Sequence, residues 1–379
     1  MPTVWNRAWL GVRSRARIGR HAALLVAALV AVGCADTDTD ETLRISSGMG
    51  QQHFWTGHHM DQFADAIEQA DESIRFSRFY SGSLVTPGQE LNALQNGIID
   101  VAAPLLAPYH EGRFPLSDVT QLPTLNTTAV QVTEAFQALL DSERELVDGK
   151  TFYQYELGGD KALVAWPVGA TSAYSLATTG AELRHPDDIA GMPIRAGSSL
   201  HTMLLQELGA TPVTMTSADS YEALSRGTVE GTILSVADWP SYSFEELLDY
   251  AIVGISMGHW ESYLALTADT WNGLTEQQRQ TWEGIAREMA LTNARHIDEV
   301  ENVVRERARA AGTRFVPMEA LPEDMQQHLA GAAGRTWIRW IERLEADGHP
   351  ARAAALLWAE LIRERGGAIP PGAAEYLGI

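Results

Sequence analysis

The sequence predicts an α/β protein made of two similar lobes, each a sheet flanked by helices, with one long helix that spans both lobes. Three observations support this prediction: a stretch in which strands and helices alternate, a short phrase that occurs twice, and a helical pattern too long for one lobe. Alternating strands and helices are typical of a parallel sheet with helices on its faces.

The stretch from His185 to Ile233 shows the alternation most clearly. The strands are expected at Met192–Ala196, Thr211–Thr214 and Val229–Ile233, and the helices over 199–208 and from a cap at Ser217 to Gly227. In parallel sheets of this kind, ligands bind beyond the carboxyl ends of the strands. Arg195 lies near such an end.

The repeated phrase links this stretch to an earlier part of the chain. Ala93–Asp100 reads ALQNGIID and Ala223–Glu230 reads ALSRGTVE, so both follow the pattern A-L-x-x-G-x-(I/V)-(D/E). Each phrase combines the end of a helix, a glycine and the start of a strand. Two similarly built lobes with a cleft between them are the simplest explanation, and a coincidental repeat is the alternative.

The long helix begins after Thr275, which has capping-box spacing to Gln278. Its helical pattern continues to about Ala311, before Gly312, with apolar residues along one face. A helix over 276–311 is roughly 54 Å long, which exceeds the width of one small lobe. A free coiled coil is the alternative, but the heptad pattern is interrupted.

The first residues are typical of an exported protein. Five arginines precede residue 21, and the apolar stretch 22–32 is too short to span a bilayer. We therefore expect a signal peptide over 1–33 and a lipid anchor and linker over 34–42. Ala31-Val32-Gly33-Cys34 resembles a bacterial lipobox, so Cys34 is the expected lipidation site. An ordinary leader with a chance cysteine is the alternative.

Composition and missing motifs exclude several functions. The 49 acidic residues outnumber the 28 lysines and arginines, which argues against nucleic-acid binding. No G-x-S-x-G, Walker A or H-E-x-x-H motif occurs, so the sequence favours a protein that is not an enzyme. We expect no membrane-spanning helix beyond the leader.

A glycine-rich turn near the start of the mature chain raises two further possibilities. Gly48–His53 resembles the dinucleotide fingerprint G-x-G-x-x-G, but His53 stands at the third glycine, where a side chain prevents close packing. His53, His58 and His59 would hold zinc only if three or four ligands converged. We expect neither a cofactor nor a metal, and an exported nucleotide- or metal-dependent enzyme is the alternative.

Three motifs in the alternating stretch resemble one protein family. They are Asp188–Arg195 (DIAGMPIR), Leu208–Val213 (LGATPV) and Tyr221–Gly231 (YEALSRGTVEG). They are similar, in order and spacing, to motifs of the solute-binding proteins of tripartite ATP-independent periplasmic (TRAP) transporters. A weaker resemblance covers about residues 43–335. It implies a two-lobed periplasmic binding protein fold that captures a small organic acid in its cleft and delivers it to TRAP membrane subunits. A ligand-sensing lipoprotein without a transporter is a further alternative.

The predicted elements and the resemblance together divide the chain. We expect lobe I over 43–162 plus 256–285, lobe II over 163–255 plus 300–335, a bridging helix over 276–311 and C-terminal helices over 336–379. Phe152–Leu157 and Ala162–Trp166 are predicted strands near the crossover between the lobes. Ile252–Met257 is expected to return the chain to the first lobe.

Arg195 is the leading candidate for a binding residue. An arginine in an apolar strand must be paired or must face a cavity. Its guanidinium can bind a carboxylate through two charge-assisted hydrogen bonds, although an internal acid could occupy it instead. The resemblance implies that the matching arginine of the family holds a ligand carboxylate.

The family's other site residues do not transfer directly to this sequence. The position of a second arginine or glutamine falls near Tyr174, where there is no positive charge. The remaining candidates are polar or aromatic residues near the expected cleft; they are Tyr174, Ser235, Trp239, Trp260, Trp55 and His53. Trp55 is equally consistent with the core. An arginine with aromatic walls suits a monocarboxylate with an apolar or aromatic body.

Overall fold

A computed structural model describes residues 41–110, 112–159 and 162–379 of the chain. The expected signal peptide and Cys34 lie outside the described residues. None of the helices in the described ranges combines the length and apolarity that a membrane crossing requires.

Lobe I is built on a five-stranded sheet with the order β2-β1-β3-β12-β6. The strands are β1 (Glu41–Ser46), β2 (Ile74–Phe79), β3 (Val101–Leu105), β6 (Leu163–Pro167) and β12 (Tyr263–Thr267). A π-helical segment η1 (Phe54–Met60) and α1 (Asp61–Ala70) connect β1 to β2, and α2 (Glu90–Gln95) connects β2 to β3. The first three strands are parallel, and β12 and β6 complete the sheet in antiparallel pairing.

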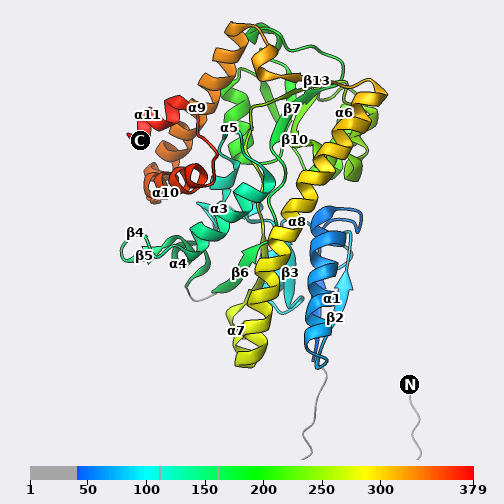
Figure 1. Ribbon diagram of the computed structural model, residues 1–379, viewed down its shortest axis with the longest axis vertical. Helices are drawn as coiled ribbons and strands as arrows, with labels where there is room; N and C mark the ends of the chain where they lie inside the picture. The colour runs from blue at the N-terminus through cyan, green and yellow to red at the C-terminus, as the bar shows by residue number, and fades with distance from the viewer. Residues whose placement is uncertain (1–40, 111, 160–161) are drawn as a thin grey trace, which may run out of the picture. The chain divides into compact units, whose positions relative to one another are not determined.

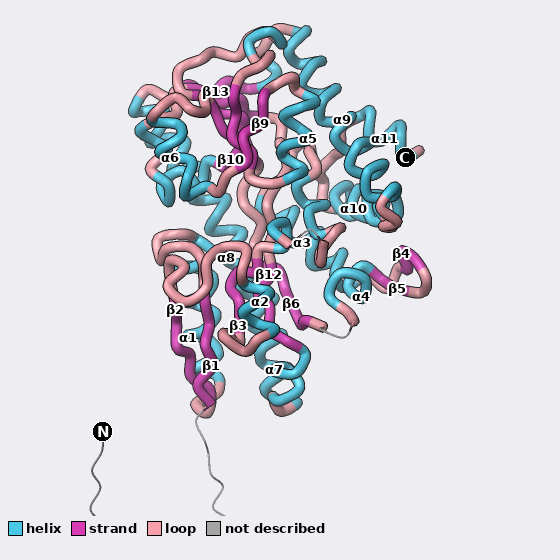
Figure 2. Tube along the Cα trace, turned by 180° about the vertical axis from the view of Figure 1, so that it is seen from behind, coloured by secondary structure: helices cyan, strands magenta, loops and turns pink. Residues whose placement is uncertain are grey.

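Lobe II is built on a six-stranded sheet with the order β13-β11-β7-β10-β8-β9. The strands are β7 (Tyr174–Thr178), β8 (Pro193–Ala196), β9 (Thr211–Thr214), β10 (Gly231–Ser235), β11 (Tyr250–Val253) and β13 (Arg314–Pro317). Helix α5 (Ser199–Glu207) connects β8 to β9, and α6 (Ser217–Ser225) connects β9 to β10. Figures 1 and 2 show the two groups of strands in separate parts of the described chain.

The two lobes repeat the same strand–helix plan. In each, the first parallel strand lies between the second and the third, so β2-β1-β3 corresponds to β9-β8-β10. The repeated phrase fills the same place in both: Gly97 (φ +63°) and Gly227 (φ +68°) end the second helix in the left-handed region. The N–H groups of Ile98 and Thr228 then donate to helix carbonyls at 2.8 Å. The predicted two-lobed α/β fold is confirmed.

Three connections join the lobes. Two are the crossover segments 168–173 and 254–262, which pair with each other: Thr171 N donates to Trp260 O and Tyr174 N to Gly258 O, both at 2.9 Å. The third is α8 (Glu276–Ala311), which has the predicted bounds and a complete capping box at Thr275. It packs against η1 and α1 in lobe I and against η5 (Val236–Tyr242) in lobe II, and Figure 1 shows it beside both sheets.

The remaining elements cover the lobes. They are α3 (Ala129–Asp141), β4 (Glu145–Val147), β5 (Lys150–Thr151), α4 (Phe152–Leu157), α7 (Ala268–Gly273), α9 (Glu323–Ala346), α10 (Ala351–Glu364) and α11 (Pro371–Leu377). Helix α9 packs on α5, and its Trp337 and Trp340 donate hydrogen bonds to Pro123 O and Asp118 Oδ1, both at 2.8 Å. Both indoles are fully buried.

The structure corrects four details of the predicted organisation. Leu163–Pro167 belongs to lobe I and not to lobe II, because it pairs with β12 along its whole length. Phe152–Leu157 is a helix and not a strand, since Thr151 and Gln154 form a capping box at its start. Strand β11 remains in lobe II, paired with β7 and β13, so the return to lobe I comes only at β12. The expected boundary between residues 335 and 336 falls inside the continuous α9.

Gly258 lies in the second crossover segment, close to Gln121 of lobe I. Its φ is +103°, and a Cβ atom there would lie 2.1 Å from Gln121 O. We predict that Gly258→Ala lowers the free energy of unfolding by more than about 2 kcal/mol, because left-handed strain alone costs about 1–2 kcal/mol. Urea unfolding followed by tryptophan fluorescence measures the loss.

Gly97→Ala is the matched control for this substitution. Gly97 also has a positive φ (+63°), but nothing lies within 4 Å of an added Cβ. It therefore carries the backbone strain without the steric clash. Equal losses of stability in the two variants would contradict the close approach to Gln121.

The crossover also buries a carboxyl group. Glu261 is 2% exposed, and its Oε1 accepts hydrogen bonds from Val168 N at 3.1 Å and Ser262 N at 2.9 Å. Burial raises the pKa of Glu261 from 4.5 to about 8, and the amide donors oppose this shift. The stability that Glu261 contributes is therefore fully present below pH 4.5 and is lost as the pH rises through about 8.

We predict that Glu261→Gln gains stability relative to the wild type as the pH rises from 5 to 9. The gain should exceed about 1.4 kcal/mol, the free energy of one pKa unit. Urea titrations at several pH values measure this gain. The pKa of Glu156 is also raised to about 8, but Glu156 is present in both proteins, so its contribution cancels in the comparison. A difference between the two proteins that does not vary with pH would contradict the assignment.

Candidate functional site

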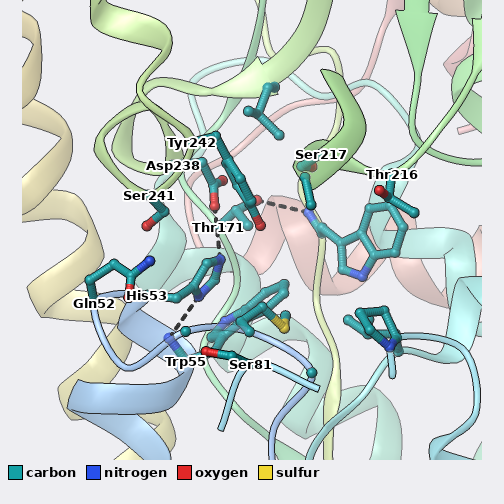
Figure 3. A pocket seen from close by; sticks show the side chains of 18 of the residues that line it. Gln52, His53, Trp55, Ser81, Thr171, Thr216, Ser217, Asp238, Ser241 and Tyr242 are labelled. Atoms are coloured by element: carbon teal, nitrogen blue, oxygen red, sulfur yellow. Dashed lines mark hydrogen bonds and ion pairs between the residues drawn. The ribbon is translucent and has the colours of Figure 1, made fainter. Parts of the chain in front are cut away.

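A cavity of about 470 Å³ lies between the two lobes. Its walls come from the segments that follow β1, β2 and β3 in lobe I, from those that follow β9 and β10 in lobe II, and from the crossover. These segments leave the carboxyl ends of the parallel strands, where α/β sheets bind their ligands. The volume falls within the roughly 300–1,000 Å³ typical of small-molecule sites. Figure 3 shows the side chains that line it.

Several aromatic side chains line the cavity. Trp55 comes from the start of η1, and Tyr109 follows β3. Tyr174 is the first residue of β7, directly after the crossover segment, and Trp260 belongs to the second crossover segment. Trp55 is held by its indole N–H, which donates to Gly169 O at 2.6 Å. The rings of Tyr109 and Trp260 meet edge to face with centroids 5.3 Å apart. A flat apolar ligand would find ring faces and edges here.

His53 joins the two lobes at one side of the cavity. It precedes η1, and its Nδ1 accepts the backbone N–H of Trp55 at 3.2 Å. Because Nδ1 is an acceptor, Nε2 carries the proton of a neutral imidazole and donates it to Asp238 Oδ1 at 3.1 Å. Asp238 Oδ2 accepts the hydroxyl of Ser235 at 2.6 Å. Figure 3 shows the His53–Asp238 contact as a dashed line.

Arg195 lies behind the opposite wall. It is the third residue of β8 and is 1% exposed. Its Nε donates to Met215 O at 3.0 Å, and Nη2 donates to the hydroxyl of Ser217, a cavity residue, also at 3.0 Å. None of the ion pairs found among the described residues includes Arg195. Its charge therefore has no internal carboxylate partner within that part of the chain.

The guanidinium of Arg195 packs closely against Gly197. A Cβ atom at Gly197 would lie 2.9 Å from Nη2 and 3.1 Å from Cζ of Arg195. The missing side chain at Gly197 thus leaves the space that the guanidinium occupies. The alternative in which an internal acid holds Arg195 is not realised among the described residues.

The first turn of α6 contributes to the same wall. Thr216 caps this helix by accepting Asp219 N at 3.3 Å, and Thr216, Ser217 and Ala218 line the cavity. The cap expected at Ser217 is therefore wrong by one residue, because the hydroxyl of Ser217 is engaged by Arg195. The first turn of a helix carries unsatisfied N–H groups and a partial positive charge. The start of α6 and the guanidinium of Arg195 thus both favour a negative charge at this wall.

Burial favours the neutral forms of Tyr174 and His201 near the cavity. It raises the pKa of Tyr174 well above its usual value, and the charge of Asp238 adds to the shift while that of Arg195 opposes it. Burial also lowers the pKa of His201 from 6.5 to about 3, and the charge of Arg195 lowers it further. The His201 ring lies against Tyr174, with centroids 5.1 Å apart. The phenol is thus a hydrogen-bond donor at neutral pH.

The seven predicted binding residues differ in their position relative to the cavity. Four line the cavity; they are His53, Trp55, Tyr174 and Trp260. Arg195 and Ser235 lie directly behind it, bonded to lining residues Ser217 and Asp238. Trp239 requires a correction: it is fully buried and packs on Phe315 with centroids 5.7 Å apart, outside the cavity wall. Trp239 follows Asp238 in the sequence, but only Asp238 lines the cavity.

Several lining residues were not expected from the sequence. Tyr109, Gln52, Ser217 and Tyr242 all line the cavity. Tyr109 and Gln52 follow β3 and β1, so the rule that ligands lie beyond strand ends was the one signal that could have identified them. Tyr242 is the last residue of η5, the 3₁₀ segment after β10, and its place depends on how that segment folds.

The three histidines of the first loop do not converge. His53 contacts Asp238, His58 stacks on His296 with centroids 3.8 Å apart, and His59 is buried beside Phe63. Across the described ranges, no group of three or more His, Cys, Asp or Glu side chains is arranged to hold a metal ion. The zinc alternative thus has no geometric support in these ranges.

Known proteins resemble this chain along most of its length. Residues 46–335 match the model of the bacterial extracellular solute-binding proteins, family 7. The outer membrane transporter protein TsaT of Comamonas testosteroni is 26% identical over 352 residues, 88% of this chain and 98% of that protein. The C4-dicarboxylate-binding periplasmic protein DctP of Rhodobacter capsulatus is 24% identical over 234 residues, 61% of this chain and 67% of that protein.

A solved structure has the same fold. It is a TRAP solute-binding protein from a marine metagenome, of an unidentified microbe, which is specific for aromatic acid ligands and was crystallised with 3-hydroxybenzoate. It aligns with a TM-score of 0.76 at 19% identity and covers 86% of this chain and 99% of its own. The match of the family model to most of the chain, together with the duplicated fold and its interlobe cavity, shows that the chain belongs to family 7 of the bacterial extracellular solute-binding proteins, the TRAP type.

Proposed function

We propose that this solute-binding protein captures a small monocarboxylic acid with an aromatic body in the interlobe cavity, with Arg195 providing the charge for the carboxylate. The observation that carries the proposal is the position of Arg195. It is 1% exposed, it has no ion-pair partner among the described residues, and it is bonded to Ser217 in the cavity wall. Burying an unpaired charge is costly, so a ligand anion would supply the missing partner.

Two features of the cavity favour this ligand class. The first turn of α6 presents its partial positive charge beside Ser217, which adds to the attraction for a carboxylate. The rings of Trp55, Tyr109 and Trp260 supply apolar faces for the body of the ligand. A marine relative of the same fold is described as specific for aromatic acids, which agrees with this assignment.

Closure of the two lobes around the ligand follows from the three connections between them. The paired crossover segments and α8 are the only covalent links between the two sheets in the described chain, so they are the places where a hinge can bend. The closed protein then delivers its ligand to the membrane subunits of a TRAP-type transporter. In this proposal the protein works in the periplasm, and a lipid on Cys34 tethers it to a membrane surface.

We predict that Arg195→Ala weakens binding of benzoate, used as the probe, by on the order of 10- to 100-fold. The reason is that one charge-assisted hydrogen bond contributes about 1.5–3 kcal/mol, and about 1.4 kcal/mol corresponds to a tenfold change in Kd. Isothermal titration calorimetry measures the affinity. Arg195→Lys, which keeps the charge without the planar fork, should fall between the wild type and Arg195→Ala.

Arg226→Ala is the matched control. It removes one positive charge from lobe II, but its side chain is 72% exposed and pairs with Glu222 on the surface of α6. Its affinity should equal that of the wild type. Equal affinity of Arg195→Ala and the wild type, with both proteins folded by circular dichroism, would remove Arg195 from the proposed role.

A further inference from the structure

We infer that Asp238 accepts hydrogen bonds from the ligand at the side of the cavity away from Arg195. The protein then selects a monocarboxylate that carries a hydroxyl or amino group, and it rejects a second carboxylate. This inference rests on the proposed function and extends it from the carboxylate end to the distal end of the ligand. It concerns a residue that the resemblance to the family does not identify.

The first step is the hydrogen-bonding capacity of Asp238. The residue is 3% exposed and lines the cavity. Oδ1 accepts one bond from His53 and Oδ2 accepts one from Ser235. A carboxylate has about four lone-pair sites, so each oxygen can accept one more hydrogen bond. A hydroxyl or amino group of a ligand is the partner that this capacity suits.

The second step is the charge of the pair. His53 is neutral, because its Nδ1 accepts the backbone N–H of Trp55 and its single proton is on Nε2. His53 therefore orients Asp238 without cancelling its charge. Within the described ranges, His53 is the one residue found at ion-pair distance from Asp238. The negative charge thus faces the cavity without a cationic partner there.

The third step is the separation of the two ends. Figure 3 shows Asp238 and His53 on one side of the cavity and Ser217 and Thr216 on the other. Arg195 is bonded to Ser217, so the positive charge is on that second side. Burial raises the pKa of Tyr242, the charge of Asp238 raises it further, and the charge of Arg195 opposes the shift, so both charges act on this one ring. A ligand that spans the cavity meets a positive end and a negative end.

Opposite ends of this kind discriminate between acids. A dicarboxylate would place its second charge against Asp238 in a site sheltered from water, where like charges repel strongly. A hydroxyl or amino group at the same place would form a charge-assisted bond. This chain should therefore differ from the C4-dicarboxylate-binding relative of Rhodobacter capsulatus.

The alternative role for Asp238 is a latch between the lobes. Its bond to His53 joins lobe II to lobe I, so it could favour closure whatever the ligand is. A latch would change the affinity for every ligand by the same factor. Selection through direct contact changes the ratio of the affinities for different ligands. This difference separates the two roles.

Calorimetry with a matched set of benzoic acids tests the inference. The probes are benzoate, 3- and 4-hydroxybenzoate, 3- and 4-aminobenzoate, and the 1,3- and 1,4-benzenedicarboxylates. In the wild type we expect the best hydroxy or amino acid to bind about tenfold or more tighter than benzoate, and both dicarboxylates about tenfold or more weaker. In Asp238→Asn the affinities of the hydroxy and amino acids and of the dicarboxylates should all lie within about threefold of the affinity for benzoate. The reason is that the substitution removes the charge and keeps the shape of the side chain.

Asp187→Asn is the control, since it removes one negative charge from an exposed position of lobe II outside the cavity wall. Its ratios should equal those of the wild type. Ratios that are unchanged in Asp238→Asn, or a wild type that binds all the acids equally, would overturn the inference while leaving the proposed function intact. A wild type that binds none of the acids would overturn both. If Asp238→Asn does not fold, the wild-type ratios alone still decide.

Discussion

A buried guanidinium that has no carboxylate partner among the described residues is the constraint on which this site depends. Arg195 donates hydrogen bonds to Met215 O, Ile233 O and Ser217 Oγ. These bonds hold the guanidinium in place but do not neutralise its charge. Neutral acceptors fix the orientation of a cation without neutralising it. Gly197 leaves the room in which the group lies. In the proposed function, this arrangement prepares the site for an anion before a ligand binds.

The duplicated strand–helix plan explains why the binding groups meet. Each lobe directs the carboxyl ends of its parallel strands toward the same cavity, so residues after β1, β3, β9 and β10 converge there. The paired crossover segments contribute Thr171 and Trp260 to the same walls. The connection between the lobes and the binding surface are therefore partly the same residues, and a change of lobe orientation alters the site directly.

The two ends of the cavity arise from different physical arrangements. At one end a helix start and a buried arginine supply positive potential from a single lobe. At the other, Asp238 of lobe II is oriented by His53 of lobe I, so the negative end is complete only when the lobes are together. An overall acidic chain can therefore bind an anion, because local positive charge outweighs a distant and screened background.

Local patterns in the sequence determined the α/β class, the duplicated lobes and the bounds of α8, because helix caps, glycine ends and apolar periodicity act over a few residues. Only the tertiary structure decided which lobe holds β6, which way Trp239 points and how His53 meets Asp238. These outcomes depend on strand pairing and on contacts between residues far apart in the chain, as with the 185 positions between His53 and Asp238. No local rule specifies such pairs, since they form only when the two lobes pack.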